Sequence, residues 1–196
     1  MDIGDRSAFR KATTEKPFEV YAFEAPIDMM SYYELHKDKL DNCRLVAMNG
    51  LNKGVVSRAV VEALSRSPED IKEVKKVVKL QDWLDKIDQM TTAAGKRYDK
   101  LRIILAVDND EPKFNPETAK IETPGKDFVM GFGIKNIEVI PHLPKCHKGQ
   151  KKNDWNDELK YQKEKARHQQ KEQEQVRSVP KPQIEQPSML SAVFGI

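Results

Sequence analysis

The chain has 196 residues, of which 38% are hydrophobic and 33% charged, and its formal net charge at pH 7 is +3. This length is enough for one compact domain with extensions. Because this net charge is close to neutral, the chain does not belong to the strongly basic proteins that coat nucleic acid without sequence preference. No segment approaches the roughly 20 apolar residues of a membrane span, and the polar N-terminus lacks the apolar core of a signal peptide. The sequence therefore predicts a cytoplasmic protein with no membrane partner.

Hydrophobic patterning predicts strands that alternate with helices in the first part of the chain. Residues 18–23 are rich in aromatic and β-branched side chains, which favours a buried strand. Pro26 suits the first turn of a helix, where its missing N–H has no intrahelical partner to lose. We expect the following elements: a strand at 18–23, a helix from Pro26 to about residue 40, a strand at 43–50 and a helix at 54–65.

The second part of the chain continues the alternation. Residues 67–70 combine a hydroxyl cap, a proline and two acids, which predicts a helix start, and apolar residues at helical spacing follow as far as Ile87. The near-continuous apolar run at 101–110 indicates a central parallel strand that is buried on both faces. The remaining segments are predicted as a loop at 111–124, a short helix at 128–132, a strand at 137–143 and a polar helix from Asp154.

This order of elements predicts an α/β fold, a four-stranded parallel sheet flanked by helices. We expect a flexible lead-in at 1–16, a domain at 17–171 with a helical insertion at 67–99, and a disordered tail at 172–196. The tail is assigned from its glutamine, proline and charge content.

Acidic residues gather where the predicted strands end. Glu24 ends the first strand and Asp28 follows one helical turn later; Asp108 and Asp110 end the central strand and share one direction on an extended backbone. Asp154 follows the last strand, where it also suits a helix cap. Ligands bind beyond the carboxyl ends of the strands in open α/β sheets, and close carboxylates repel unless a cation lies among them. Three acidic strand ends therefore favour a Mg²⁺ or Mn²⁺ site, although each pair alone is more typical of a turn or a cap.

Other side chains suggest different partners. The chain has two cysteines, and they are too far apart in sequence to form a typical zinc-ligand pair, so there is little support for structural zinc. Lysines crowd the loop after the last strand, and we take three of them as nucleic-acid contacts: Lys148, Lys151 and Lys152. A solvated loop is the commoner reading of such a run. Trp155 could stack on a base, but within the motif DWND it more often anchors a helix to the sheet.

These motifs resemble the Toprim domain that topoisomerases, primases and nucleases share. The resemblance rests on FEAPID after the first strand, LAVDND after the central strand and KNDWNDEL after the last, over about residues 17–165. The sequence is most similar to Toprim-like domains of plasmid, conjugative-element and phage primase-like proteins. The resemblance implies a Rossmann-like sheet, a general acid/base at Glu24, and Mg²⁺ or Mn²⁺ ligands at Asp108, Asp110, Asp28 and Asp154.

The sequence also departs from the family pattern. Ala25 and Pro26 follow the glutamate where the family often has glycine, and Asn156 stands where cellular primases have aspartate. Insertions at about 67–99 and 111–123 interrupt the usual spacing. No zinc-binding segment and no separate polymerase half accompany the domain.

The resemblance implies an enzyme, a Mg²⁺-dependent and primase-like nucleotidyltransferase in DNA replication or in plasmid or conjugative mobilisation. Its expected partners are DNA (single-stranded DNA included), nucleotides and a replication or mobilisation protein. Two alternatives stay open: a Toprim-type nuclease, and a non-catalytic accessory module that binds DNA or a protein. A phosphoacceptor receiver domain needs a lone acceptor aspartate and a downstream lysine at a strand end, and the sequence lacks that layout.

Overall fold

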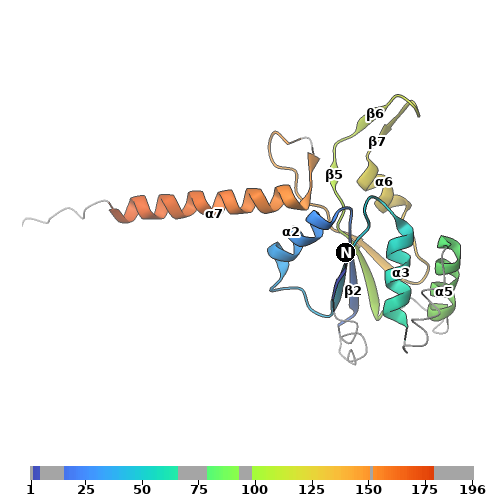
Figure 1. The fold of residues 1–196 in the computed structure, drawn as a ribbon. Helices are drawn as coiled ribbons and strands as arrows, with labels where there is room; N and C mark the ends of the chain where they lie inside the picture. Colours follow the sequence, from blue (N-terminus) through green and yellow to red (C-terminus); the bar gives the residue numbers. More distant parts are fainter. Residues whose placement is uncertain (1, 5–15, 66–78, 93–98, 151, 179–196) are drawn as a thin grey trace, which may run out of the picture. The chain divides into compact units, whose positions relative to one another are not determined.

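The structure is a computed structural model of the chain, and it describes residues 2–4, 16–65, 79–92, 99–150 and 152–178 (Figure 1). The chain divides into two compact units, Met1–Tyr161 and Gln162–Ile196. The first unit holds a five-stranded sheet with helices on both faces. In the second unit, the described residues continue the helix α7 (Trp155–Ser178), which begins in the first.

The sheet has the strand order β1-β3-β2-β4-β8. Its four central strands pair in parallel: β3 (Cys43–Ala47), β2 (Phe18–Phe23), β4 (Leu101–Leu105) and β8 (Glu138–Pro141). The predicted four-stranded parallel, Rossmann-like sheet is thereby confirmed.

The strand β1 (Asp2–Gly4) is an addition to that prediction. It pairs antiparallel with β3 at the edge of the sheet, although we expected residues 2–4 to belong to an unstructured lead-in. An edge strand needs only backbone partners. A short segment can therefore form an edge strand without the hydrophobic pattern from which a strand is predicted.

Helices connect the parallel strands as predicted, except that the last connecting helix begins at Pro124, at the end of the predicted loop, and not at residue 128. They are α2 (Pro26–His36), α3 (Lys53–Leu64), α5 (Leu80–Thr92) and α6 (Pro124–Gly131). The first of these ends at His36 instead of residue 40, because the amides of Lys39 and Leu40 both bond to the His36 carbonyl and close a turn. The predicted helix start at 67–70 lies outside the described residues. Within the described ranges, none of the helices has the length and apolar character that crossing a membrane requires.

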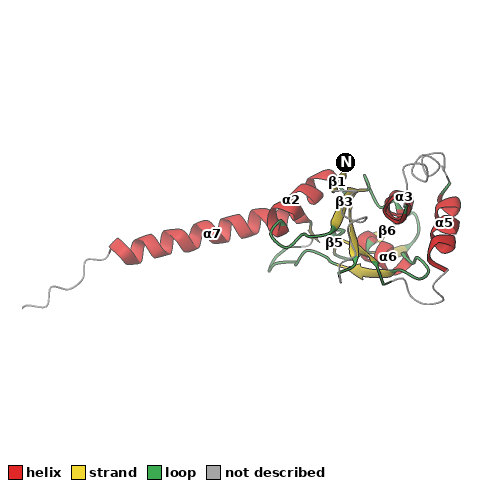
Figure 2. Ribbon diagram, turned by 90° about the horizontal axis from the view of Figure 1, so that it is seen from below, coloured by secondary structure: helices red, strands yellow, loops and turns green. Residues whose placement is uncertain are grey.

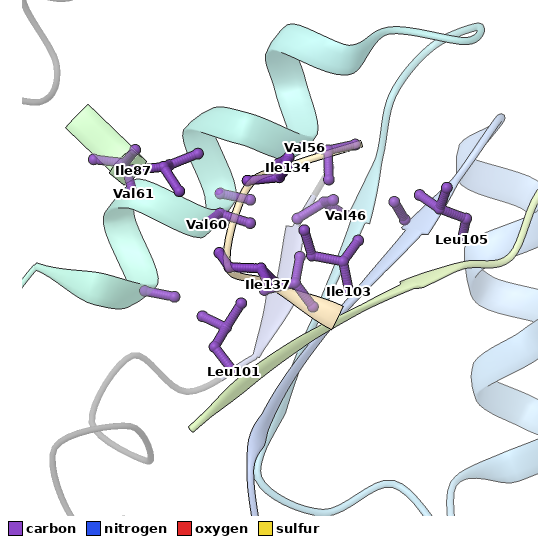
Figure 3. Packing of buried hydrophobic residues seen from close by; sticks show 14 of the residues in the cluster. Val46, Val56, Val60, Val61, Ile87, Leu101, Ile103, Leu105, Ile134 and Ile137 are labelled. Atoms are coloured by element: carbon purple, nitrogen blue, oxygen red, sulfur yellow. The ribbon is translucent and has the colours of Figure 1, made fainter. Parts of the chain in front are cut away.

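Two hydrophobic layers cover the two faces of the sheet. One lies between the sheet and the helices α3 and α5, and its buried residues include Val46, Val60, Ile87, Ile103 and Ile137 (Figure 3). The other lies under α2 and the start of α7, on the opposite face (Figures 1 and 2), and includes Phe23, Met29, Tyr32, Leu45 and Trp155. Each fully buried large apolar side chain contributes roughly 1.5–3 kcal/mol of transfer free energy, so both layers hold the strand ends in place.

The central strand is shorter than predicted. β4 ends at Leu105, and the amide of Ala106 still bonds to the carbonyl of Ala22 on β2 at 2.8 Å. The chain then leaves the sheet, and Asn109–Asp110 forms β5, which pairs antiparallel with β9 (Lys152–Asn153). The prediction of one strand over 101–110 is therefore wrong after Leu105. The apolar run does not mark this point, because Ala106 and Val107 stay buried after they leave the ladder.

The segment 111–124 contains a hairpin, although its prolines predict a loop. Its strands are β6 (Lys113–Asn115) and β7 (Lys120–Glu122), and Phe114 pairs with Ile121. The three prolines of this segment flank the two strands and interrupt neither, which is where a β-hairpin tolerates proline. They mark the ends of two short strands and do not exclude them.

Candidate functional site

The strand order places a topological switch point between β2 and β4. The chain leaves β2 through α2 to build β3 on one side, and it returns through α3 and α5 to build β4 on the other. Open α/β sheets bind their ligands in the crevice at such a point, beyond the carboxyl ends of the strands. Glu24 follows β2 directly, and Asp108 lies three residues beyond the end of β4.

Three of the predicted metal ligands are buried at this edge. Asp28 is 4% exposed, Asp108 5% and Asp110 8%. Among the residues that the structure describes, one oxygen of each (Oδ1) has no hydrogen-bond partner. A buried carboxylate without compensation is unfavourable by several kcal/mol, so a nearby cation would lower the free energy of these oxygens, as Lys152 Nζ already does for Asp110 Oδ1 at 3.8 Å.

The electrostatic coupling shows that these acids are neighbours. Burial first, and then the charge of Asp108, raise the pKa of Glu24. Burial, together with the charges of Asp108 and Asp154, raises the pKa of Asp28 to about 6. A hydrogen bond from the backbone N–H of Asn156 favours the ionised form and limits this increase. Acids from the ends of β2 and β4 and from the first turns of two helices thus face one another, as the sequence predicted.

The backbone around Glu24 is fixed by the turn after β3. The carbonyl of Glu24 accepts a hydrogen bond from the amide of Gly50 at 2.9 Å. Gly50 has a φ of +95°, in the region that favours glycine. The Asn49-Gly50 turn therefore joins the ends of two neighbouring strands and positions the backbone that carries Glu24.

Lys152 lies among the carboxylates. Its Nζ is 2.7 Å from Asp108 Oδ2 and 3.8 Å from Asp110 Oδ1. Burial raises the pKa of Asp108, and this ammonium offsets part of the increase. We predicted Lys152 as a contact to nucleic acid, and the structure instead pairs it with the predicted metal ligands. Sequence reasoning missed this ion pair because Asp110 and Lys152 lie far apart in the chain and nothing in the pattern aligns β5 with β9.

The buried side chain of Asn153 fixes the short strand β9, which also carries Lys152. The Asn153 side chain is fully buried and donates to the carbonyl of Lys145 and to Glu158 Oε2. Glu158 also bonds to His147 Nε2 at 2.7 Å. These contacts tie the loop before β9 to the first turns of α7, and they fix the backbone from which Lys152 reaches the aspartates.

The remaining predicted site residues have different surroundings. Asp154 Oδ1 accepts a hydrogen bond from the amide of Asp157 at 2.7 Å, so this residue caps α7, the alternative role that the sequence allowed. Trp155 is 3% exposed and donates from Nε1 to the carbonyl of Ala106 at 3.1 Å. It anchors α7 to the sheet and presents no ring face for base stacking. Lys148 is exposed, and Lys151 lies outside the described residues.

The donor set fits a hard divalent cation in its chemistry. Among the described residues, no group of three or more histidine, cysteine, aspartate or glutamate side chains is placed so that it could hold a metal ion. The carboxylate oxygens are nevertheless buried, close to like charges and in part unpartnered, and oxygen ligands of this kind suit Mg²⁺ or Mn²⁺. The Lys152 ammonium, which contacts both Asp108 and Asp110, already supplies one positive charge to these two carboxylates.

Comparisons of this chain with family models, with curated proteins and with solved structures gave no match. Its function has to be argued from its own residues and their geometry.

Proposed function

We propose that this chain carries a Toprim-like module that performs Mg²⁺-dependent phosphotransfer on nucleic acid. The observation that supports it best is the group of buried, partly unpartnered aspartate oxygens at the switch point of the sheet: Asp28, Asp108 and Asp110. Buried like charges raise one another's pKa and destabilise the fold unless a cation compensates them. Selection for stability alone would replace them, so their presence argues for a ligand.

The residues divide into distinct roles. Asp108 and Asp110 would hold the cation, with Asp28 and Asp154 in support. Bound there, Mg²⁺ or Mn²⁺ supplies Lewis acidity toward a phosphoryl oxygen. Glu24, with a pKa raised by burial and by Asp108, would accept the proton of an attacking hydroxyl and return it to the leaving group.

The substrate in this proposal is DNA, single-stranded DNA included, with nucleotides as the second reactant. Lys148, on the loop that follows the last parallel strand, is exposed and would contact the phosphate backbone of the substrate. Primer synthesis together with partner domains of a replication or mobilisation protein is the favoured form, and strand cleavage is the alternative within the same chemistry. Such an activity accords with a cytoplasmic location.

One observation favours a second candidate, a non-catalytic module that binds DNA or a partner protein. The Lys152 ammonium already neutralises part of the charge of Asp108 and Asp110. If Lys152 keeps that position, the acids hold a divalent cation only weakly and the site performs no phosphotransfer.

An assay with labelled single-stranded DNA, nucleotides and Mn²⁺ separates these functions. The wild type should extend or cleave the strand, and a variant with Asp108→Ala and Asp110→Ala should do neither. A matched control removes two exposed acids of α5, with Asp82→Ala and Asp85→Ala, and should keep full activity. Extension identifies a primase-like enzyme and cleavage a nuclease. Mn²⁺ binding that depends on Asp108 without any product supports the accessory module, and the absence of both binding and product contradicts the metal site.

A further inference from the structure

The pairing of Lys152 with Asp108 and Asp110 joins a half-exposed cation to a buried pair of anions. Both aspartates are more than nine-tenths buried. The Lys152 side chain is 45% exposed, although its Nζ hydrogen bonds to Asp108 Oδ2 at 2.7 Å. A lysine of this kind can leave its partners by rotating its own side chain into solvent, whereas the aspartates cannot follow it.

The backbone beneath Lys152 does not have to move in that exchange. Asp110 and Lys152 are direct partners in the β5–β9 ladder, and the neighbouring pair is Asn109 with Asn153. The buried Asn153 side chain fixes this ladder to Lys145 and Glu158. Movement of the ammonium is thus confined to the four-carbon chain of Lys152, whose rotamers interconvert rapidly where they are exposed.

The charges at this edge are not balanced by the ammonium alone. Burial is the largest cause of the raised pKa values of Glu24, Asp28 and Asp108, and the charge of Asp108 adds to the increase for Glu24 and Asp28. Each of the aspartates Asp28, Asp108 and Asp110 keeps an oxygen that has no hydrogen-bond partner among the described residues. A divalent ion brings twice the charge of the ammonium and accepts several oxygen ligands at once, so it competes with Lys152 for the Asp108 and Asp110 carboxylates on favourable terms.

We propose that Lys152 is an exchangeable internal counter-ion, which holds Asp108 and Asp110 while the divalent cation is absent and withdraws when that cation binds. This inference rests on the proposed metal site and adds that Lys152 competes with the metal ion for the carboxylates of that site. Each bound metal ion displaces one ammonium from the carboxylates, and no bond is made or broken except these ionic contacts. Lys152 therefore sets the metal concentration at which the site fills.

The test is a Mn²⁺ titration of the full chain by calorimetry, with four proteins compared in the same buffer. Lys152→Met removes the competing charge and should bind Mn²⁺ about tenfold more tightly than the wild type, the effect of losing one partly exposed ion pair. Lys145→Met removes an exposed charge from the same loop and should bind like the wild type. Asp108→Asn should abolish binding, which identifies the site.

A second variant and a second measurement guard against misfolding. Lys152→Arg keeps a cation and should bind Mn²⁺ more weakly than Lys152→Met. Thermal unfolding should show a larger Mn²⁺-dependent gain in Tm for Lys152→Met than for the wild type, because the variant without its ammonium depends more on the metal.

Each outcome decides the matter. Equal or weaker Mn²⁺ affinity in Lys152→Met, with wild-type binding that still requires Asp108, overturns the exchange and leaves the proposed function standing. Binding by Lys152→Met at metal concentrations where the wild type binds none supports the exchange strongly. No binding by any of these proteins at millimolar Mn²⁺ overturns the exchange and the proposed function together.

Discussion

Gly125, at the start of α6, lies directly against the backbone carbonyl of Asp108. A Cβ atom at this position would overlap the Asp108 carbonyl oxygen and would also contact Val107. The first turn of α6 can therefore approach the segment that follows β4 this closely only because residue 125 has no side chain. The contact fixes the backbone that presents Asp108 to the carboxylate cluster.

We predict that Gly125→Ala destabilises the protein by about 1–3 kcal/mol, because backbone atoms on both sides must move apart. Gly131→Ala is the matched control. A Cβ at Gly131, in the same helix, meets no atom within 4 Å, so this change should be neutral or stabilise by up to about 1 kcal/mol. Urea unfolding of both variants measures the difference, and equal stability would contradict the tight contact at Asp108.

A buried ion pair on the α3 side of the sheet gives a second prediction. Arg44 on β3 contacts Glu62 on α3 at 2.7 Å, and both residues are buried. Arg44→Met should lower the free energy of unfolding by roughly 3–5 kcal/mol, because it removes the buried partner of a buried carboxylate. Arg58→Met removes a half-exposed arginine that contacts the same glutamate at 3.2 Å and should cost about 1 kcal/mol or less. If both variants lose the same amount, Glu62 does not depend on Arg44.

The raised pKa of Asp28 predicts a stability change with a definite sign. Its pKa is about 6 in the folded protein, against an ordinary value of 3.8. The folded state thus binds the proton more tightly than the unfolded state, so this residue costs stability as pH rises from 3.8 through 6. Asp28→Asn should remove that loss and, without divalent ions, stabilise the protein by on the order of 1–3 kcal/mol at about pH 7.5.

The gain from Asp28→Asn should shrink to near zero at about pH 3, where both the folded and the unfolded states of the wild type are mostly protonated. Urea unfolding in EDTA at the two pH values measures it. A gain that is the same at both pH values would mean that the charge of Asp28 is not its cause.

Glu24→Gln tests the proposed proton transfer apart from metal binding. The amide keeps the size of the side chain but cannot accept the proton, so turnover should fall roughly 10²- to 10⁴-fold. Mn²⁺ affinity should change little, since the proposed ligands are aspartates. Turnover that survives the change would remove Glu24 from the chemistry, and a parallel loss of Mn²⁺ affinity would make it a metal ligand.

The parallel sheet could be predicted from sequence because its three inner strands are mostly apolar and buried. Ile103 and Leu105 face one layer and Ala106 faces the other, so a strand buried on both faces shows as a continuous hydrophobic run. The hairpin β6–β7 could not be found in this way. Phe114 and Ile121 are 67% and 73% exposed, and no burial pattern distinguishes their strands from a loop.

The site could be predicted only to the level of its acids. The carboxyl ends of parallel strands meet at one edge of a sheet, so the sequence alone predicts that Glu24 lies near Asp108. The pairing of Asp110 with Lys152 depends on two-residue strands, and the close approach of Gly125 to Asp108 depends on how α6 docks. Neither leaves a periodic signal, because both are tertiary contacts between segments that are separated in the chain. The sequence allows two roles for Trp155, and its burial decides between them.

The most direct measurement is anomalous scattering from Mn²⁺ in crystals of the protein. The account predicts a peak within about 2.0–2.3 Å of carboxylate oxygens of Asp108 and Asp110, with the Lys152 ammonium moved away from Asp108. A crystal saturated with Mn²⁺ that shows no peak at this edge, and Lys152 still bonded to Asp108, would contradict it.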